Sequence, residues 1–359
     1  MPKVQTIHSK RNYFSIKFVA HLKNMTITHE SSLDNFTDQI DFVLNNYKPH
    51  GLKTEQFSNV IMGGLGGSGI GGAIAKTYFF NSFPIPVDAI SDYHLPAYVN
   101  EKSLVILNSY SGNTEETLSM YDEAKTRGCA ILIIASGGKL LDIAKTNGHH
   151  YNVLELGFQP RMTIGYGLSY LLMPLGELVG YDTRTELEDV VASFKEDQEM
   201  QKASAQRIFN YFKGSLKNKF VIVADAAFAP VALRFTQQIN ENAKLEAFVN
   251  VLPESNHNVI ESYVDRLQTN FVMLYGNSNE RVSARFDFLI SHLELDNNKV
   301  LPLFVPEYDI HSIFDMIYRL DWVSVLMANE LNAPLMEVPI ITNLKEYLSN
   351  LEIIEDEEE

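Results

Sequence analysis

The chain has 359 residues, a length typical of about two domains, and 45% of them are hydrophobic, which excludes a disordered protein. The formal net charge of −16 argues against nucleic acid or an anionic membrane as a general partner, because their phosphates would repel the protein. Cys129 is the single cysteine, so no disulfide forms within the chain, and no apolar run approaches the roughly 18 residues of a membrane span. We therefore expect a globular, cytoplasmic protein.

The first 30 residues are predicted to be an N-terminal extension of poor order. Residues 1–24 contain five basic residues and no acidic one, and their longest apolar run, Phe18–Ala20, is too short for the core of a signal peptide. Apolar residues at helical spacing then predict an amphipathic helix over Ser31–Asn46.

Short apolar strands and helices alternate after this point, as in parallel α/β proteins. Asn59–Met62, Leu104–Asn108 and Ala130–Ala135 are continuous apolar runs, which is expected for strands that helices cover on both faces. A helix is predicted from about Ile70 to Phe80, after the first strand, and a second helix follows the next strand.

The second half of the chain repeats the order of the first. Val221 lies 161 residues after Val60, and Val272 lies 167 residues after Val105, each pair occupying the same place in a strand–loop–helix unit. Two such units at similar offsets indicate an internal duplication. DAAFAP at 225–230 stands where the first half has a glycine run, so only the first half is expected to hold a phosphate.

These patterns predict two doubly wound parallel-sheet domains, each a three-layer αβα arrangement of the α/β class. We expect the extension at 1–30, the first domain at 31–182, a helical connection at 183–213, the second domain at 214–350 and an acidic tail at 351–359.

The glycine run GGLGGSGIGG at 63–72 follows a strand and opens a helix. Glycines let the backbone approach a ligand, and the free amides at a helix start attract an anion, so Gly66, Gly67 and Ser68 are predicted to bind phosphate. The run also matches the dinucleotide fingerprint, with Asp88 as its acidic partner. An NAD-dependent Rossmann oxidoreductase is therefore the rival prediction.

The loop SYSGNTEET at 109–117 favours phosphate over a dinucleotide. Ser109, Ser111 and Thr114 place three hydroxyls between a strand and a helix, which suits a compact phosphate monoester. A dinucleotide has no need of a second hydroxyl-rich loop. Plain helix capping requires a single such residue, so it leaves the others unexplained.

The two loops together resemble the sugar isomerase (SIS) domain. NENAK at 240–244, followed by PESNHN at 253–258, is similar to the bifunctional phosphoglucose/phosphomannose isomerases, and the resemblance extends from about residue 57 to 348. It implies an aldose–ketose isomerase that interconverts glucose 6-phosphate, and mannose 6-phosphate, with fructose 6-phosphate through an enediol(ate). It also implies a homodimer with a shared active site. Isomerisation through an enediol needs neither a metal nor an organic cofactor, so we expect none.

The resemblance assigns four reactive residues: Glu241 is the base, His257 opens the sugar ring from the neighbouring subunit, Arg161 stabilises the enediolate, and Lys345 closes over the substrate. Without the resemblance, each has an ordinary interpretation: a solvated glutamate, a loop histidine, a surface salt bridge and a solvated helix lysine.

Two other functions use the same kind of domain. A non-catalytic sugar-phosphate-binding regulator would carry a partner module such as a DNA-binding helix-turn-helix, and the sequence shows none. An amidotransferase would need an N-terminal glutaminase with a catalytic cysteine, a role that Cys129 in a strand cannot fill. No histidine or cysteine pair has the spacing of a metal site.

Overall fold

The computed structural model describes residues 27–263, 268–277, 279–295 and 298–351. Most of the predicted extension and most of the predicted acidic tail lie outside these residues. The last residues of the extension differ from the prediction, because helix α2 begins at His29 and the His29 side chain is buried. In the part of the chain that is described, no helix has the length and apolar character needed to cross a membrane.

The first half contains a sheet of five parallel strands in the order β2-β1-β3-β4-β5. Its strands are β1 (Asn59–Gly63), β2 (Val87–Ile90), β3 (Ser103–Asn108), β4 (Ala130–Ala135) and β5 (His150–Val153). The second half contains a sheet of four parallel strands in the order β7-β6-β8-β9. Its strands are β6 (Phe220–Ala224), β7 (Ala247–Val251), β8 (Asn270–Tyr275) and β9 (Lys299–Phe304). The second sheet thus repeats the order of the first without its last strand.

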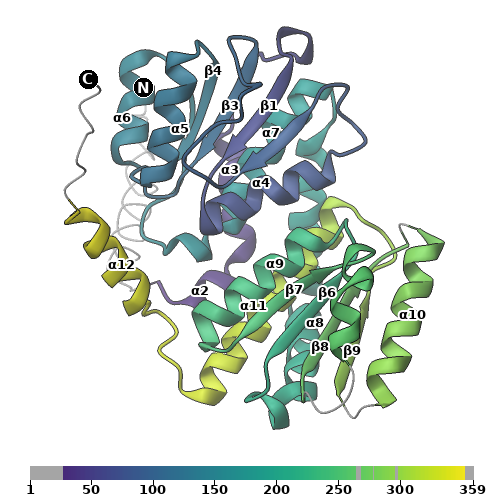
Figure 1. Cartoon of the computed structure of the whole chain (residues 1–359). Helices are drawn as coiled ribbons and strands as arrows, with labels where there is room; N and C mark the ends of the chain where they lie inside the picture. The colour runs from purple at the N-terminus through teal and green to yellow at the C-terminus, as the bar shows by residue number, and fades with distance from the viewer. Residues whose placement is uncertain (1–26, 264–267, 278, 296–297, 352–359) are drawn as a thin grey trace, which may run out of the picture.

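Helices cover both faces of both sheets (Figure 1). In the first half they are α2 (His29–Asp34), α3 (Phe36–Asn46), α4 (Gly66–Tyr78), α5 (Glu115–Thr126), α6 (Gly138–Asn147) and α7 (Ile164–Val179). The remaining helices are α8 (Thr183–Phe212), α9 (Ala229–Gln238), α10 (Glu280–Leu295), α11 (Ile310–Leu331) and α12 (Pro339–Ser349). The predicted fold class is confirmed.

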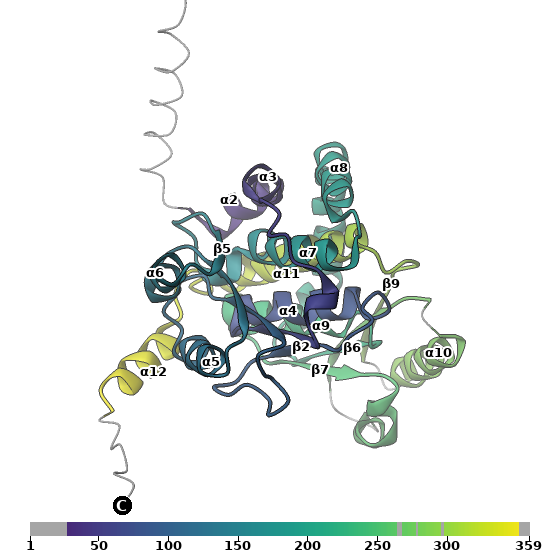
Figure 2. The same cartoon turned by 90° about the horizontal axis from the view of Figure 1, so that it is seen from above.

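The two sheets share one layer of helices. The view from above shows α4, α7, α9 and α11 between them (Figure 2), and their side chains form one continuous core with the inner faces of both sheets. α5 and α6 cover the outer face of the first sheet, while α10 covers the outer face of the second. Strand β1 contributes to both sides, since Val60 and Met62 lie in the shared core and Ile61 lies in the outer one.

Two helix predictions differ from the structure. The helix expected over 31–46 is two helices, which meet at Asn35. Helix α4 begins at Gly66, four residues before the predicted Ile70. Glycine is a poor helix former in general, but Gly67 and Gly69 in this first turn lie too close to other backbone for a Cβ atom, which local propensity does not reveal.

Candidate active site

The two loops predicted to hold phosphate adjoin at the carboxyl edge of the first sheet. The Tyr110 amide donates a hydrogen bond to Ser68 Oγ over 3.2 Å, and Asn108 Nδ2 donates to the Ser68 carbonyl over 3.1 Å. The loop after β1 and the loop after β3 are therefore held together through Ser68.

Ser109 and Thr114 face each other across the second loop. Their hydroxyl oxygens lie 2.8 Å apart, and the Ser109 side chain is buried. Thr114 is the N-cap residue of α5, yet its side chain makes no capping hydrogen bond. The capping interpretation therefore fails for Thr114. Ser111 is exposed at the tip of the loop and accepts a hydrogen bond from the Asn113 amide over 3.2 Å.

Glycines are required where the first loop touches its neighbours. A Cβ on Gly67 would lie 2.9 Å from the Pro160 carbonyl oxygen, and a Cβ on Gly64 would lie 2.7 Å from the Asn108 carbonyl oxygen. Gly66 has a φ of +53°, a left-handed conformation that side chains disfavour. No side chain in the described part of the chain caps α4, so amides in its first turn can meet an anion.

Arg161 joins the first half to the second. It lies in a 3-10 helix, η2 (Pro160–Met162), which packs against the start of α4. Its Nε donates to Asn242 Oδ1 over 2.9 Å, and its Nη2 donates to the Leu335 carbonyl over 2.6 Å. The side chain is buried, and this burial lowers the pKa of Arg161, while the nearby Glu241 carboxylate opposes that shift.

A buried polar network holds the backbone of Arg161. Its carbonyl accepts hydrogen bonds from Arg234 Nη2 over 3.0 Å and from Gln238 Nε2 over 3.2 Å. Arg234 also forms a buried ion pair with Asp321 over 2.5 Å. Asn242 Nδ2 donates to Ser324 Oγ over 2.9 Å. The backbone of Arg161 is thus held from α9, and Asn242, which binds the guanidinium, is held by Ser324 of α11.

Glu241 lies beside Arg161, on a single turn of π-helix, η4 (Ile239–Ala243), that ends α9. Its Oε2 is 3.7 Å from Arg161 Nη1, and its side chain remains 31% exposed. Lys244 follows with a φ of +58°, and its ammonium donates to the Glu241 carbonyl. Burial, followed by the charge of Arg161, lowers the pKa of Lys244. The structure therefore groups Glu241 with two cations, and one of them, Arg161, also lies beside the start of α4.

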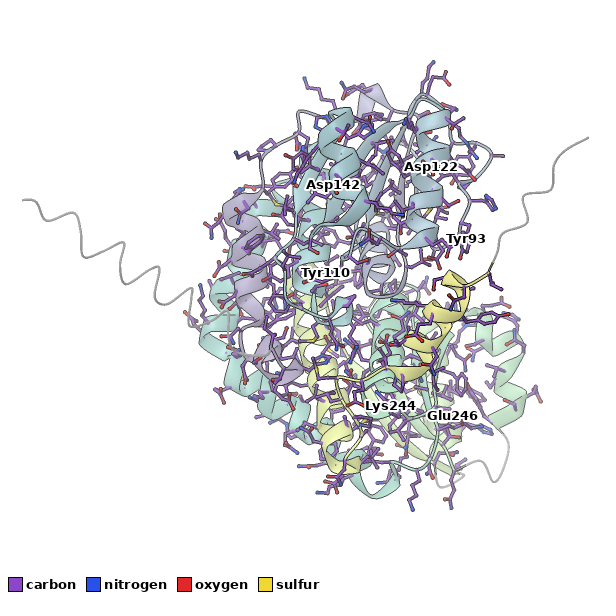
Figure 3. All side chains as sticks on the ribbon, turned by 90° about the vertical axis from the view of Figure 1, so that its left-hand side faces the viewer. Tyr93, Tyr110, Asp122, Asp142, Lys244 and Glu246 are labelled. Carbon is purple, nitrogen blue, oxygen red and sulfur yellow. The ribbon has the colours of Figure 1, made fainter. Side chains whose placement is uncertain are left out.

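The structure does not place His257 and Lys345 with these residues. His257 is exposed in a 3-10 helix, η5 (Glu254–His257), beyond the carboxyl end of β7, whereas Glu241 precedes the amino end of the same strand. Lys345 is exposed on α12. Figure 3 shows α12 passing the junction of the halves on the side where Lys244 and Glu246 lie.

Sequence reasoning missed three residues around Arg161. Asn242 and Lys244 stand inside the quoted NENAK stretch but received no role. His29 is 1% exposed, neither ring nitrogen has a hydrogen-bond partner among the described residues, and burial and the charges of Arg161 and Arg234 lower its pKa to about 3. The spacing of apolar residues in the sequence predicts none of these contacts with Arg161.

The structure does not support the role of Asp88 as the acidic partner of a dinucleotide. Asp88 forms an ion pair with Lys76 over 2.6 Å and accepts a hydrogen bond from Tyr98, so it is not presented to a ribose. Among the described residues, no group of three or more histidine, cysteine, aspartate or glutamate side chains is arranged to hold a metal.

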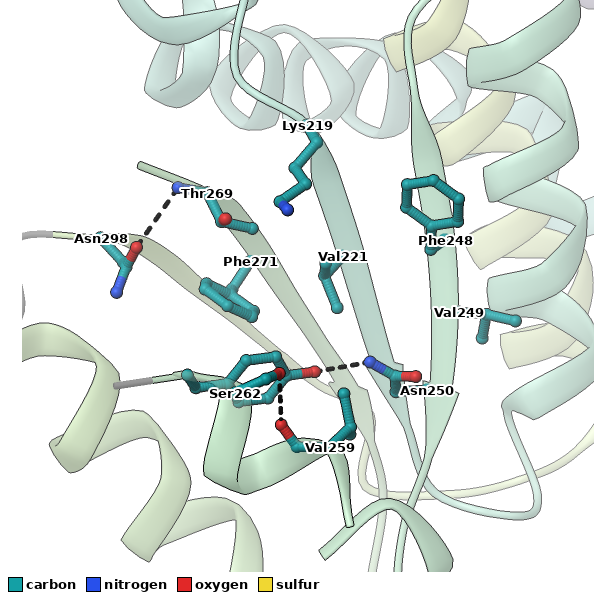
Figure 4. Close-up of a pocket in the computed structure, with 11 residues that line it drawn as sticks. Lys219, Val221, Phe248, Val249, Asn250, Val259, Ser262, Thr269, Phe271 and Asn298 are labelled. Carbon is teal, nitrogen blue, oxygen red and sulfur yellow. Dashed lines mark hydrogen bonds between the residues drawn. The ribbon is translucent and has the colours of Figure 1, made fainter. Parts of the chain in front are cut away.

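A hollow of about 380 Å³ lies elsewhere, on the outer face of the second sheet (Figure 4). Val221, Phe248 and Phe271 form much of its apolar lining, and Ser262 and Tyr263 of the 3-10 helix η6 (Val259–Tyr263) close one side. None of the predicted site residues lines it. It is therefore separate from the candidate active site.

Comparison with known proteins gives one consistent family. The model of the bacterial phospho-glucose isomerase C-terminal SIS domain matches residues 201–348. The bifunctional phosphoglucose/phosphomannose isomerase of Aquifex aeolicus (strain VF5) is 35% identical over 301 residues, which cover 81% of this chain and 91% of that protein. The D-glucosamine-6-phosphate 4-epimerase of Sulfolobus acidocaldarius is 32% identical over 302 residues, covering 84% of this chain and 92% of that protein.

Solved structures share the fold. The C-terminal domain of glucosamine-fructose-6-phosphate aminotransferase from Francisella tularensis aligns with a TM-score of 0.68 at 13% identity, covering 88% of this chain and 99% of that chain. At this identity the likeness concerns the fold alone.

Proposed function

The chain belongs to the family of the bifunctional phosphoglucose/phosphomannose isomerases, and on this premise we propose that it interconverts glucose 6-phosphate, and mannose 6-phosphate, with fructose 6-phosphate. One observation carries the proposal: the Glu241 carboxylate and the Arg161 guanidinium lie 3.7 Å apart, and η2, which carries Arg161, packs against the start of α4. A base and a fixed cation beside an anion site are what isomerisation of a sugar phosphate requires.

The phosphate would bind between the two loops. The amides of Gly66 and Gly67 and the hydroxyl of Ser68 come from the start of α4, and the hydroxyls of Ser109 and Thr114 come from the second loop. Ser111 lies at the exposed tip of that loop. Two helix starts and three or four hydroxyls match a dianion with three acceptor oxygens.

Glu241 and Arg161 would then act on C1 and C2 of the open-chain sugar. The Glu241 carboxylate takes the proton from C2 of the aldose, so the carbonyl oxygen at C1 becomes an enediolate oxyanion. The guanidinium of Arg161 stabilises this charge, since it stays protonated at any working pH. A proton then passes from the C2 hydroxyl to the oxygen at C1, the protonated Glu241 returns its proton to C1, and the carbonyl forms at C2. Mannose 6-phosphate enters the same enediolate from the opposite configuration at C2.

Ring opening would require His257 of a second copy. Glu241 and His257 lie at opposite ends of β7, whose five residues span roughly 13 Å at 3.3 Å per residue. Glu241 lies at the end of β7 that adjoins the first half. His257 of the same chain lies at the other end of β7, away from Glu241. We propose a cytoplasmic homodimer in which each active site takes this histidine from the partner.

Helix α12 would close over the bound sugar. Ile340, Leu344 and Tyr347 lie on one side of the helix and are 83%, 54% and 63% exposed. The segment that leads to α12 is anchored at the site, because Gln159 Nε2 donates to the Met336 carbonyl over 2.8 Å, next to the bond from Arg161 to Leu335. A small rotation about this anchor would bring Lys345 toward the substrate.

A second candidate comes from the Sulfolobus acidocaldarius relative, whose name describes a 4-epimerase of D-glucosamine 6-phosphate. Epimerisation changes the configuration at C4, whereas isomerisation changes C1 and C2, so the products of the two reactions can be told apart. Proton NMR of fructose 6-phosphate and of glucosamine 6-phosphate, each incubated with the protein, tests the proposal. Formation of glucose and mannose 6-phosphates supports it. A C4 epimer as the main product favours the second candidate, and binding without turnover favours a regulator.

A further inference from the structure

In the second half, a buried carboxylate stands where the first half has its glycine loop. Asp225 directly follows β6, as Gly64 directly follows β1, and both strands stand second in the same order of strands. One Asp225 carboxylate oxygen accepts from the Phe228 amide over 2.8 Å, and the other accepts from the Gly276 amide over 2.9 Å. The side chain is 1% exposed.

These two amides are the counterparts of backbone at the phosphate loops. Phe228, the N-cap residue of α9, lies three residues after Asp225, as Gly67 in the first turn of α4 lies three residues after Gly64, and Gly276 directly follows β8 as Ser109 directly follows β3. A single carboxylate thus joins the two loops at the carboxyl edge of the second sheet. Helix capping alone would explain the bond from the Phe228 amide. It does not explain the bond from the Gly276 amide, which belongs to the other loop.

Side chains and backbone pack closely around these two loops. The Phe228 ring is buried and packs edge-on against Tyr308, with ring centres 5.0 Å apart. A Cβ on Gly276 would lie 2.7 Å from the Val305 carbonyl and 3.3 Å from the Phe228 ring. Pro230 in the first turn of α9 also removes one amide donor that α4 keeps.

We propose that the second half retains an anion site equivalent to the phosphate site of the first half, and that the Asp225 carboxylate is its permanent occupant. This explains why a chain with two similar halves would bind one sugar phosphate. The proposal deepens the proposed function, because it rests on the phosphate site of the first half. It predicts a specific gain: removing the carboxylate opens a site for inorganic phosphate but not for a hexose phosphate.

The test uses Asp225→Ala and Asp225→Asn, each alone and combined with Ser109→Ala/Thr114→Ala, which removes the first site. Thermal unfolding is followed in sodium chloride and in sodium phosphate at equal ionic strength and pH. Asp225→Ala should be less stable than the parent in chloride and should recover by roughly 2 °C or more in phosphate, because an anion that binds only the folded state stabilises it. Asp225→Asn, whose amide still occupies the site, should show no such recovery, and fructose 6-phosphate should not replace phosphate.

The outcomes separate this proposal from the proposed function. Recovery of Asp225→Ala in phosphate, with or without the first site, supports the second anion site, as does a variant that folds only in phosphate. Equal instability of Asp225→Ala in chloride and phosphate, or failure to fold in either salt while Asp225→Asn folds, overturns it. If Ser109→Ala/Thr114→Ala still binds fructose 6-phosphate as the parent does, the first site is wrongly assigned, whatever Asp225 does.

Discussion

The guanidinium of Arg161 and the carboxylate of Glu241 lie 3.7 Å apart, although one belongs to the first half of the chain and the other to the second. Arg161 also bonds to Asn242 and to the Leu335 carbonyl, so it ties both halves and the segment before α12 to one point.

Replacing Arg161 by lysine should lower kcat about 100-fold, the size of effect seen when one donor to a developing oxyanion is removed. Lysine keeps the charge but cannot make the two bonds of the guanidinium, to Asn242 and to Leu335, at once. The change should leave KM within a few-fold, because the phosphate loops are intact. A coupled assay of fructose 6-phosphate conversion measures this, with Arg184→Lys, whose side chain is 41% exposed on α8, as the control. An unchanged kcat would remove Arg161 from the mechanism.

Replacing Ser109 and Thr114 together by alanine should raise KM strongly, since each bond to a charged group contributes roughly 1.5–3 kcal/mol. Their hydroxyls pair with each other at 2.8 Å, so in the free protein they can satisfy one another until phosphate arrives. Ser119→Ala is the matched control, because Ser119 lies on α5, whose N-cap residue is Thr114. A KM equal to that of the parent would place the phosphate elsewhere.

His29 should make the protein less stable as the pH falls. Its pKa is about 3 in the folded chain, and about 6.5 is expected when it is unfolded, so the unfolded state binds the extra proton between these values. The free energy of unfolding should therefore fall by up to about 1.4 kcal/mol per pH unit below pH 6.5. Urea unfolding at pH 7.5 and pH 5 measures this change.

His29→Leu should remove most of that dependence, whereas the exposed His94→Leu should keep it. The leucine keeps the buried volume without a titrating ring. If His29→Leu and the parent lose the same stability between the two pH values, His29 titrates normally and its burial has another explanation.

Mixing two inactive variants should restore activity if the sites are shared. Glu241→Gln subunits lack the base and His257→Ala subunits lack the ring-opening group, and these residues lie at opposite ends of β7. With complete exchange about half of the dimers are mixed, and each mixed dimer has one intact site, so about a quarter of the full activity should return. No recovery after proven exchange, or a fully active monomer, would refute the shared site.

Much of the fold could be predicted because its signals are local. Continuous apolar strands, helical periodicity and the two strand–loop–helix repeats indicated the parallel sheets, and the glycine and hydroxyl loops indicated one edge of the first sheet. The family predicted from NENAK and PESNHN is confirmed by relatives that cover most of the chain.

The contacts between the halves could not be predicted in this way. Arg161 meets Asn242 and Leu335 only because α4 and α9 pack together, and no spacing in the sequence reports that packing. His29 looked like part of a poorly ordered extension, since burial beside two arginines is a long-range property. The role of Asp225 required both loops of the second sheet to be in place.

The most direct test of the account is proton NMR of fructose 6-phosphate incubated with the protein in D2O, followed by the same experiment with Glu241→Gln. If Glu241 carries a proton between C1 and C2, solvent deuterium should enter C1 of fructose 6-phosphate and C2 of the glucose 6-phosphate that forms. The glutamine variant should bind the substrate but lose both exchange and product by a factor of at least about 100. Conversion by Glu241→Gln at the rate of the parent, or binding by the parent with neither exchange nor conversion, would contradict the account.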